Sequence, residues 1–168
     1  FRSDLAEMAM AYRDVYVASI SLGADPGQTL MAIKEAQSFE GTSLLLAYSP
    51  CVGHGMFDMK DIANEQKLAV TSGYWPLFRF DPRREERGRN PFILDSKKIS
   101  SDRLADFLGN ETRFEVLRRQ SPSLAESLHG DLADILQDRQ SRFKYLSEQK
   151  TATTKKSKKT KKAKKKKK

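Results

Sequence analysis

The chain has 168 residues, of which 38% are hydrophobic and 32% charged, and its formal net charge is +9. This length suffices for one domain with a hydrophobic core, or for a part of a larger protein. We expect no membrane span, because no run approaches the roughly 18–20 apolar residues that one requires. A single Cys and no apolar leader predict a reducing compartment, either the cytoplasm or a reducing organelle. Since the chain begins at Phe1 rather than Met, we expect a fragment or a processed chain.

The positive charge is concentrated at one end of the chain. Eleven of the 31 Lys and Arg residues lie in Thr151–Lys168, which contains no acid, so residues 1–150 hold 20 basic and 22 acidic residues and carry −2. The segment 151–168 consists only of Thr, Ser, Ala and Lys, and such a composition predicts a disordered tail. We therefore divide the chain into a folded part, 1–150, and a Lys-rich tail, 151–168. Such a tail can bind polyanions, with an affinity that falls as salt rises.

The N-terminal pattern predicts a helix followed by a strand. Residues Asp4 to Tyr12 have apolar side chains at helical spacing, with Ser3 as a plausible N-cap. The β-branched and aromatic run from Val15 to Ser21 predicts a strand.

The next two elements predict a parallel crossover. Asp25 is a suitable N-cap and Pro26 suits the first turn of a helix whose inward face we assign to Leu30, Ile33 and Ala36–Gln37. The strand Ser43–Tyr48 follows, and its apolar residues on both faces are typical of a central parallel strand. We expect these two strands to be adjacent and parallel, with the helix 26–39 packed across them in an α/β fold with an open, mainly parallel sheet.

The second half of the chain predicts shorter elements and then helices. We expect a helix at Ala63–Thr71 ended by Gly73, and a strand in "YWPLFRF" that Pro76 demotes toward a sheet edge. The charged stretch "DPRREERGRN" is typical of a loop, and "PFILDS" of an extended segment. Helical spacing resumes at Ser101, and a last long helix runs from about Pro122 to Glu148. We place seven apolar residues on one side of that helix: Leu124, Leu128, Leu132, Ile135, Leu136, Phe143 and Leu146.

The only cysteine, Cys51, lies in the segment "AYSPCVGHG", directly after the strand 43–48. From its position alone, two interpretations remain open. Cys51 is either a small packed residue at a strand end, or part of a site at the carboxyl ends of the strands, where open α/β sheets place their ligands. Gly53 and Gly55 leave backbone N–H groups free to approach a ligand closely. A Cys51–His54 nucleophile and base has little support, because no third group is seen to orient them.

Other polar and aromatic residues have ordinary structural explanations. We expect Asp58, Asp61 and Glu65 to form a solvated helix start, since they lack the spacing of a calcium-binding loop. His129 fits a helix face. The four arginines of the charged loop (Arg83, Arg84, Arg87 and Arg89) alternate with acids and fit a solvated loop, whereas Trp75, Phe78 and Phe80 fit a core. No nucleotide-binding glycine loop is found.

Four segments in order carry a family resemblance: "AYRDVYVASISLGAD", "SLLLAYSPCVGHG", "KLAVTSGYWPLFRFDP" and "GRNPFILDSKK". Together they resemble the C-terminal part of pyruvate:ferredoxin (flavodoxin) oxidoreductase, over about residues 4–148. The resemblance implies that this chain is the later half of a thiamine-diphosphate-binding α/β domain. It also implies an enzyme that oxidatively decarboxylates pyruvate to acetyl-CoA with thiamine diphosphate, Mg²⁺ and coenzyme A, and passes electrons through 4Fe-4S clusters to ferredoxin or flavodoxin.

The resemblance also gives Cys51 a role. Cys51 lies where the family motif Pro-Cys-x-x-His-Gly supplies one thiolate to a 4Fe-4S cluster, with Gly53 and Gly55 as candidate backbone supports. The remaining ligands, and the Gly-Asp-Gly…Asn segment that binds diphosphate and metal, are not found in this chain. The resemblance further implies a homodimer in which this chain is joined to the rest of the oxidoreductase. A different class of protein remains as the alternative: a separate α/β binding module whose Lys-rich tail attaches it to nucleic acid or an anionic surface.

Overall fold

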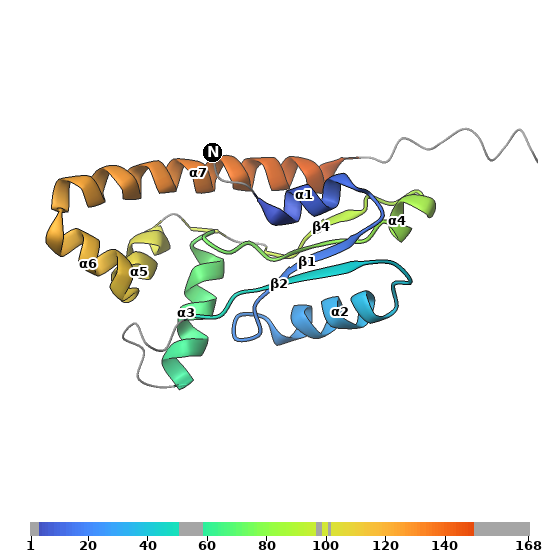
Figure 1. The fold of residues 1–168 in the computed structure, drawn as a ribbon, viewed down its shortest axis with the longest axis horizontal. Coiled ribbons are helices and arrows are strands. Elements are labelled where there is room, and N and C mark those ends of the chain that lie inside the picture. Colours follow the sequence, from blue (N-terminus) through green and yellow to red (C-terminus); the bar gives the residue numbers. More distant parts are fainter. Residues whose placement is uncertain (1–3, 51–58, 97–98, 101, 150–168) are drawn as a thin grey trace, which may run out of the picture.

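The computed structural model describes residues 4–50, 59–96, 99–100 and 102–149. They form an α/β fold in which helices cover both faces of one sheet (Figure 1). The predicted Lys-rich tail, and the Cys51 segment 51–58, lie outside these residues.

The sheet contains the strands β1 (Tyr16–Ile20), β2 (Ser43–Ala47), β3 (Phe78–Phe80) and β4 (Phe92–Leu94), in the spatial order β2-β1-β3-β4. β1 and β2 are parallel, with Tyr16 opposite Ser43, which confirms the predicted adjacent parallel pair. β1 pairs with β3, and β3 with β4, in the antiparallel sense. The prediction of a mainly parallel sheet is therefore wrong for the described residues, where the sheet is mixed.

The helix α2 (Pro26–Gln37) makes the crossover between β1 and β2. Its start agrees with the sequence analysis, since the Asp25 carboxylate accepts a hydrogen bond of 2.8 Å from the Gln28 N–H. The predicted inward face is right for Ala36, which packs against the cluster below the helix. It is wrong for Leu30 and Ile33, which are 54% and 43% exposed, and for Gln37, which is also exposed. The fully buried residues of the helix are Gln28, Thr29 and Ala32. Gln28 is accommodated there because its amide donates to the Ser19 carbonyl and to Asp95 Oδ2, each at 3.1 Å.

Two predicted strand positions also differ from the structure. β2 is the edge strand of the described sheet rather than a central one, and its residues are half-buried or exposed. β3 was predicted at an edge but lies between β1 and β4 with all three residues buried. Pro76 does not prevent this, because it precedes the first strand residue, Phe78, and so removes no hydrogen bond within the strand.

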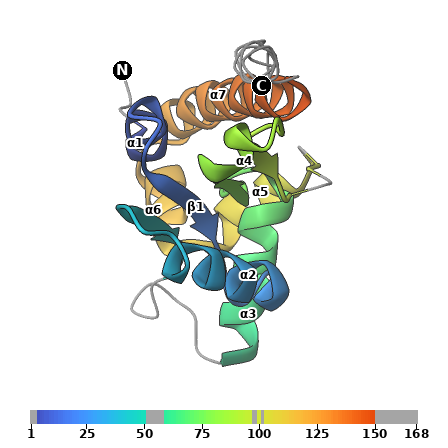
Figure 2. The ribbon, with the colours of Figure 1, turned by 90° about the vertical axis from the view of Figure 1, so that its right-hand side faces the viewer.

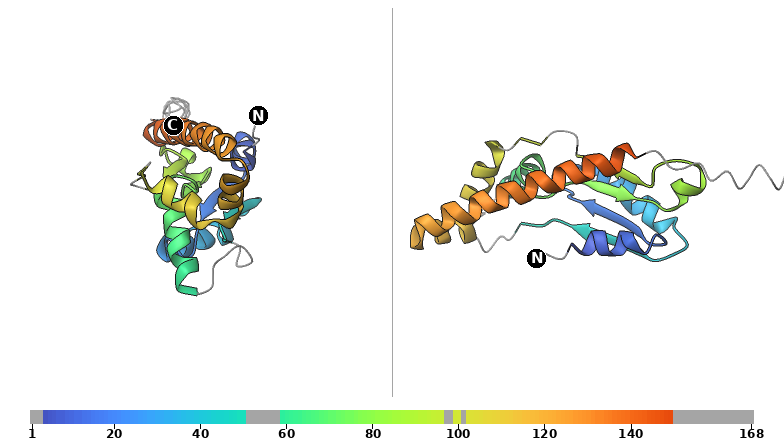
Figure 3. Two further views of the ribbon diagram at one scale, coloured as in Figure 1. Left: turned by 90° about the vertical axis from the view of Figure 1, so that its left-hand side faces the viewer. Right: turned by 90° about the horizontal axis from the view of Figure 1, so that it is seen from above.

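The other face of the sheet is covered by α1 (Leu5–Ala11) and by the long helix α7 (Pro122–Glu148), which runs obliquely above the strands (Figures 2 and 3). The N-cap of α1 is Asp4, whose carboxylate accepts from the Ala6 N–H at 2.9 Å. The proposed cap Ser3 lies outside the described residues. α7 has the predicted bounds, but its apolar face is only partly buried, since Leu124 and Ile135 are 51% and 52% exposed.

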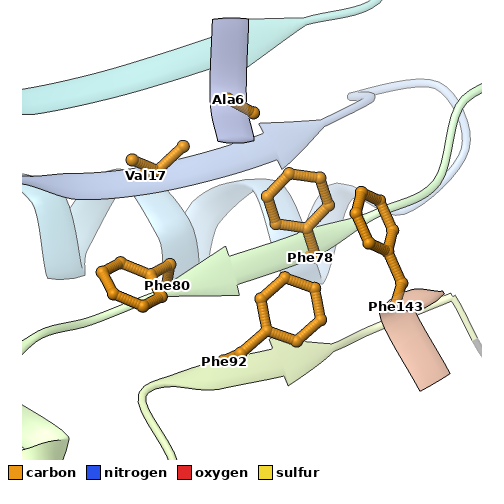
Figure 4. Packing of buried hydrophobic residues seen from close by; sticks show 6 residues of the cluster. All are labelled: Ala6, Val17, Phe78, Phe80, Phe92 and Phe143. Atoms are coloured by element: carbon orange, nitrogen blue, oxygen red, sulfur yellow. The ribbon is translucent and has the colours of Figure 1, made fainter. Parts of the chain in front are cut away.

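An aromatic cluster joins α7 to the sheet (Figure 4). The ring of Phe143 on α7 lies 5.0 Å from Phe78 and 5.4 Å from Phe92, measured between ring centroids. Ala6 of α1 and Val17 of β1 complete its buried part. These contacts confirm Phe78 and Phe80 as core residues.

The remaining helices pack at one end of the sheet (Figure 1). They are α3 (Met59–Thr71), α5 (Asp102–Asn110) and α6 (Thr112–Gln120). Gly73, with φ of +80°, ends the turn after α3, a conformation that favours glycine. A single helical turn, α4 (Arg83–Glu86), occurs in the predicted charged loop. Arg83 there is not merely solvated, because its guanidinium donates to the Glu35 and Ser38 carbonyls at the end of α2.

Candidate functional site

The carboxyl ends of the parallel strands β1 and β2 meet at one edge of the sheet. The Tyr48 N–H donates to the Ile20 carbonyl at 3.0 Å, so the chain stays attached to β1 just beyond the end of β2. Residues 48–50 then lead into the segment that carries Cys51, Gly53, His54 and Gly55. Those four residues lie outside the described part, so their predicted roles stay predictions.

The side chain of Tyr48 holds the entrance to this segment against the junction of α5 and α6. Its hydroxyl donates to Glu111 Oε1 at 3.0 Å. Glu111 is 3% exposed, and its Oε2 also lies 3.0 Å from Arg113 Nε. Burial, followed by the adjacent Glu111 charge, raises the pKa of the Tyr48 hydroxyl above its ordinary value, so this phenol remains a hydrogen-bond donor at neutral pH.

A second buried carboxylate, Glu65 on α3, lies in the same region. The prediction of a solvated helix start is wrong for Glu65, which is 3% exposed, although Asp61 is exposed. Asn110 Nδ2 donates to Glu65 Oε2 at 2.9 Å, whereas Glu65 Oε1 is buried without a hydrogen-bond partner among the described residues. Burial raises the pKa of this carboxyl, since little around it compensates for the lost hydration.

The turn after β1 is bound to α3. Gln66 Oε1 accepts hydrogen bonds from the Ser21 hydroxyl at 2.9 Å and from the Gly23 N–H at 2.8 Å. A Cβ atom at position 23 would lie only 2.8 Å from Gln66 Nε2, so glycine allows this close approach. On the other side, Trp75 Nε1 donates to the Ile20 carbonyl at 3.1 Å. The strand end is therefore fixed from both sides.

The metal-binding capacity of the described residues is limited. They contain no group of three or more His, Cys, Asp or Glu side chains that could hold a metal ion. The whole chain has one cysteine, so its residues fit the contribution of one thiolate to a 4Fe-4S cluster, which ordinarily takes four.

The remaining candidate residues take structural positions. His129 lies half-buried on α7, with its ring at a steep angle to Phe114 and 6.0 Å away, as expected of a helix-face residue. Gln66, Asn110 and Glu111 were not identified from the sequence, because no short motif connects them to Cys51. The sequence feature that could have pointed to them is Tyr48, which follows an apolar strand directly. A tyrosine hydroxyl that is buried there needs a hydrogen-bond partner. Among the described helices, none combines the length and apolar character needed to cross a membrane.

Comparison of the sequence with known proteins shows which family the chain is similar to. No family model matches the chain. It is 42% identical over 147 residues to pyruvate:ferredoxin oxidoreductase of Moorella thermoacetica, and 43% identical over 147 residues to the probable pyruvate-flavodoxin oxidoreductase of Escherichia coli. A mitochondrial pyruvate dehydrogenase (NADP⁺) of Euglena gracilis is 40% identical over 148 residues.

These matches cover 88% of the chain but only 12% of the bacterial relatives and 8% of the Euglena protein. The chain thus spans about a tenth of the length of the curated relatives that it matches. With the Moorella protein the alignment extends over 147 of the 168 residues. Over this length the chain belongs to the family of pyruvate:ferredoxin and pyruvate-flavodoxin oxidoreductases, of which it represents one segment.

Proposed function

We propose that the chain is the segment of a pyruvate oxidoreductase that contributes an α/β scaffold and one cysteine ligand to a 4Fe-4S cluster. The complete protein would decarboxylate pyruvate oxidatively with thiamine diphosphate and Mg²⁺, transfer the acetyl group to coenzyme A, and reduce ferredoxin or flavodoxin. The observation that carries the proposal is the sequence identity of 42–43% over 147 residues to a pyruvate:ferredoxin oxidoreductase and a probable pyruvate-flavodoxin oxidoreductase. The same proposal takes residues 1–150 as the folded part of the chain. It also includes ferredoxin or flavodoxin as the electron acceptor, a homodimeric enzyme and a reducing compartment.

The fold supports a ligand role for Cys51 through what lies on either side of it. Cys51 follows buried Pro50 at the carboxyl end of a parallel strand, where α/β sheets place their sites. Tyr48 fixes the chain before it through Ile20 and Glu111. On the far side, α3 is tied to the end of β1 through Gln66. A bound cluster would supply one-electron transfer, and these residues would hold the chain in place on either side of the segment 51–58.

The test is the iron content of the complete protein after Cys51→Ser. Because serine replaces the thiolate with a poor ligand, we expect loss of up to about four iron atoms per chain and of one cluster signal in electron paramagnetic resonance. The matched control is Ser49→Ala, an exposed position two residues away, which should retain both. Full iron content and normal acceptor reduction in Cys51→Ser would show that Cys51 is a packed strand-end residue instead.

A further inference from the structure

A cavity of about 290 Å³ lies where the helices α5, α6 and α7 meet, at the end of the molecule where α7 begins (Figure 1). Its floor is apolar and consists of Leu104 and Leu108 of α5 and Phe114 of α6. Gly109 borders the cavity on the α5 side, and a Cβ atom added there would meet nothing within 4 Å. Ligand cavities in proteins begin at roughly 300 Å³. This cavity therefore suits a ligand with one aromatic ring or a branched alkyl chain.

His129 of α7 lines the same cavity and brings a polar atom without a partner. Its Nε2 is buried and has no hydrogen-bond partner among the described residues. An edge-to-face contact with Phe114, 6.0 Å between ring centroids, holds the imidazole in place. A buried ring nitrogen without a partner is uncommon in a native protein. In the Nε2–H tautomer and in the protonated ring this atom donates, so an oxygen of a bound ligand would satisfy it.

The rim of the cavity carries an excess of positive charge. Glu115 of α6 lies next to two arginines, with Arg118 2.6 Å from its Oε2 and Arg119 3.0 Å from its Oε1. Only the Arg119 contact has the alignment of a hydrogen bond, whereas Oε2 is buried without one among the described residues. Arg119 alone therefore compensates the Glu115 carboxylate. The guanidinium of Arg118, which is 63% exposed, can then pair with a second anion.

We propose that this cavity binds a small monocarboxylate with an aromatic or branched apolar body. The apolar body lies on the floor of the cavity, and the carboxylate accepts hydrogen bonds from the Arg118 guanidinium and from His129 Nε2–H. Its single negative charge matches the one cation that Glu115 leaves over, and a guanidinium matches the two oxygens of a carboxylate. The inference goes beyond the proposed function and does not depend on it, because the site is built from α5, α6 and α7 alone.

Calorimetric titration of the complete protein with phenylacetate tests the class of ligand. Phenylacetamide is the matched control compound, because it has the same ring and nearly the same shape but no charge. We expect phenylacetate to bind at one site per chain, and phenylacetamide at least about 10-fold more weakly, since charge-assisted hydrogen bonds are the stronger ones. No binding of phenylacetate, or equal binding of the two compounds, would overturn the proposal.

Three variants of the complete protein test the location. Gly109→Leu fills the cavity from a position where an added side chain has room, and it should abolish phenylacetate binding. Arg118→Gln and His129→Phe each remove one hydrogen-bond donor to the carboxylate and should weaken binding by about 10-fold. The matched control is Arg103→Gln, an arginine of α5 that is 62% exposed and does not line the cavity. It should bind within about twofold of the parent, because exposed ion pairs contribute little.

The urea midpoint of each variant shows whether the variant is folded. Should Gly109→Leu fail to fold, Arg118→Gln still decides, since it changes only an exposed side chain. Phenylacetate binding that is the same in Arg118→Gln and the parent would lie elsewhere and would overturn the proposal. The iron content of Cys51→Ser is a separate measurement, so this site and the proposed function can fail independently.

Discussion

The two faces of the sheet are stabilised by different interactions, although the strand β3 contributes to both. Phe78 and Phe80 belong to the apolar cluster under α7, and Arg79 between them contacts Glu35 of α2. This alternation is the ordinary period of a strand. The α7 face needs only side chains of suitable shape, whereas the α2 face needs specific partners for a buried charge.

Arg79 illustrates that second requirement. Its side chain is 9% exposed and donates to both oxygens of Asp95, at 2.8 and 2.9 Å, and to Glu35 Oε1 at 2.7 Å. Hydrogen bonds to Asp95 raise the pKa of the guanidinium above its already high value, so the charge is permanent. The Tyr16 hydroxyl also donates to Glu35. The α2 face therefore combines an apolar cluster around Ala18, Ile20 and Ala32 with a connected polar network beneath the helix.

The first prediction concerns the aromatic face and has the largest expected effect. Phe143→Ala removes a ring that contacts both Phe78 and Phe92 and leaves a cavity. It should lower the free energy of unfolding by about 3–5 kcal/mol, measured by urea denaturation. Ile135→Ala on the same helix is the control, and since Ile135 is 52% exposed it should cost less than about 1 kcal/mol. Equal effects of the two variants would contradict the importance of the cluster.

The second prediction separates the polar face from the aromatic one. Arg79→Ala leaves Glu35 and Asp95 without their shared cation and should cost about 2–4 kcal/mol, less than a fully buried pair because Glu35 keeps 29% of its exposure. Arg79→Ala introduced into the double variant Glu35→Gln/Asp95→Asn should lower the free energy of unfolding by less than half as much. Urea denaturation of the parent, Arg79→Ala, the double variant and the combined variant gives the coupling energy between Arg79 and the two carboxylates. Additive effects would show that Arg79 acts through packing alone.

The comparison also shows how far the sequence determines the fold. Asp25 and Pro26 determine the start of α2 locally, and Phe78, Phe80 and Phe143 follow apolar spacing, so these were predictable. Arg79 was not predicted to be buried, because its partner Glu35 lies 44 residues away along the chain.

The errors have a similar cause. Apolar spacing selected Leu30 and Ile33 as inward positions of α2, but the helix buries Gln28 instead. Its amide donates to Asp95, 67 residues away along the chain. The same limit applies at the candidate site. The role of Cys51 stays a prediction from its motif. The burial of Glu65 depends on how α3 packs against α5, which no local pattern encodes.

The last prediction extends the comparison to a buried carboxylate that has an amide partner instead of an arginine. Glu65 accepts a hydrogen bond from Asn110, and burial raises its pKa in the folded chain above the unfolded value of about 4.3. Between the two pKa values the folded state keeps a proton that the unfolded state has released. Stability is therefore complete below the unfolded pKa and is lost as pH rises through the folded pKa.

Glu65→Gln keeps an acceptor for Asn110 but cannot ionise, so it removes this loss. The variant should match the parent near pH 4 and become more stable than it toward pH 8, as measured by urea midpoints across that range. Glu40→Gln, at an exposed position in the turn before β2, is the control for the substitution itself and should change the free energy of unfolding by less than about 0.5 kcal/mol. Parallel curves for Glu65→Gln and the parent would mean that Glu65 is hydrated in solution. The opposite slope would mean that a cation beside Glu65 compensates its charge, as Arg79 does for Glu35 and Asp95.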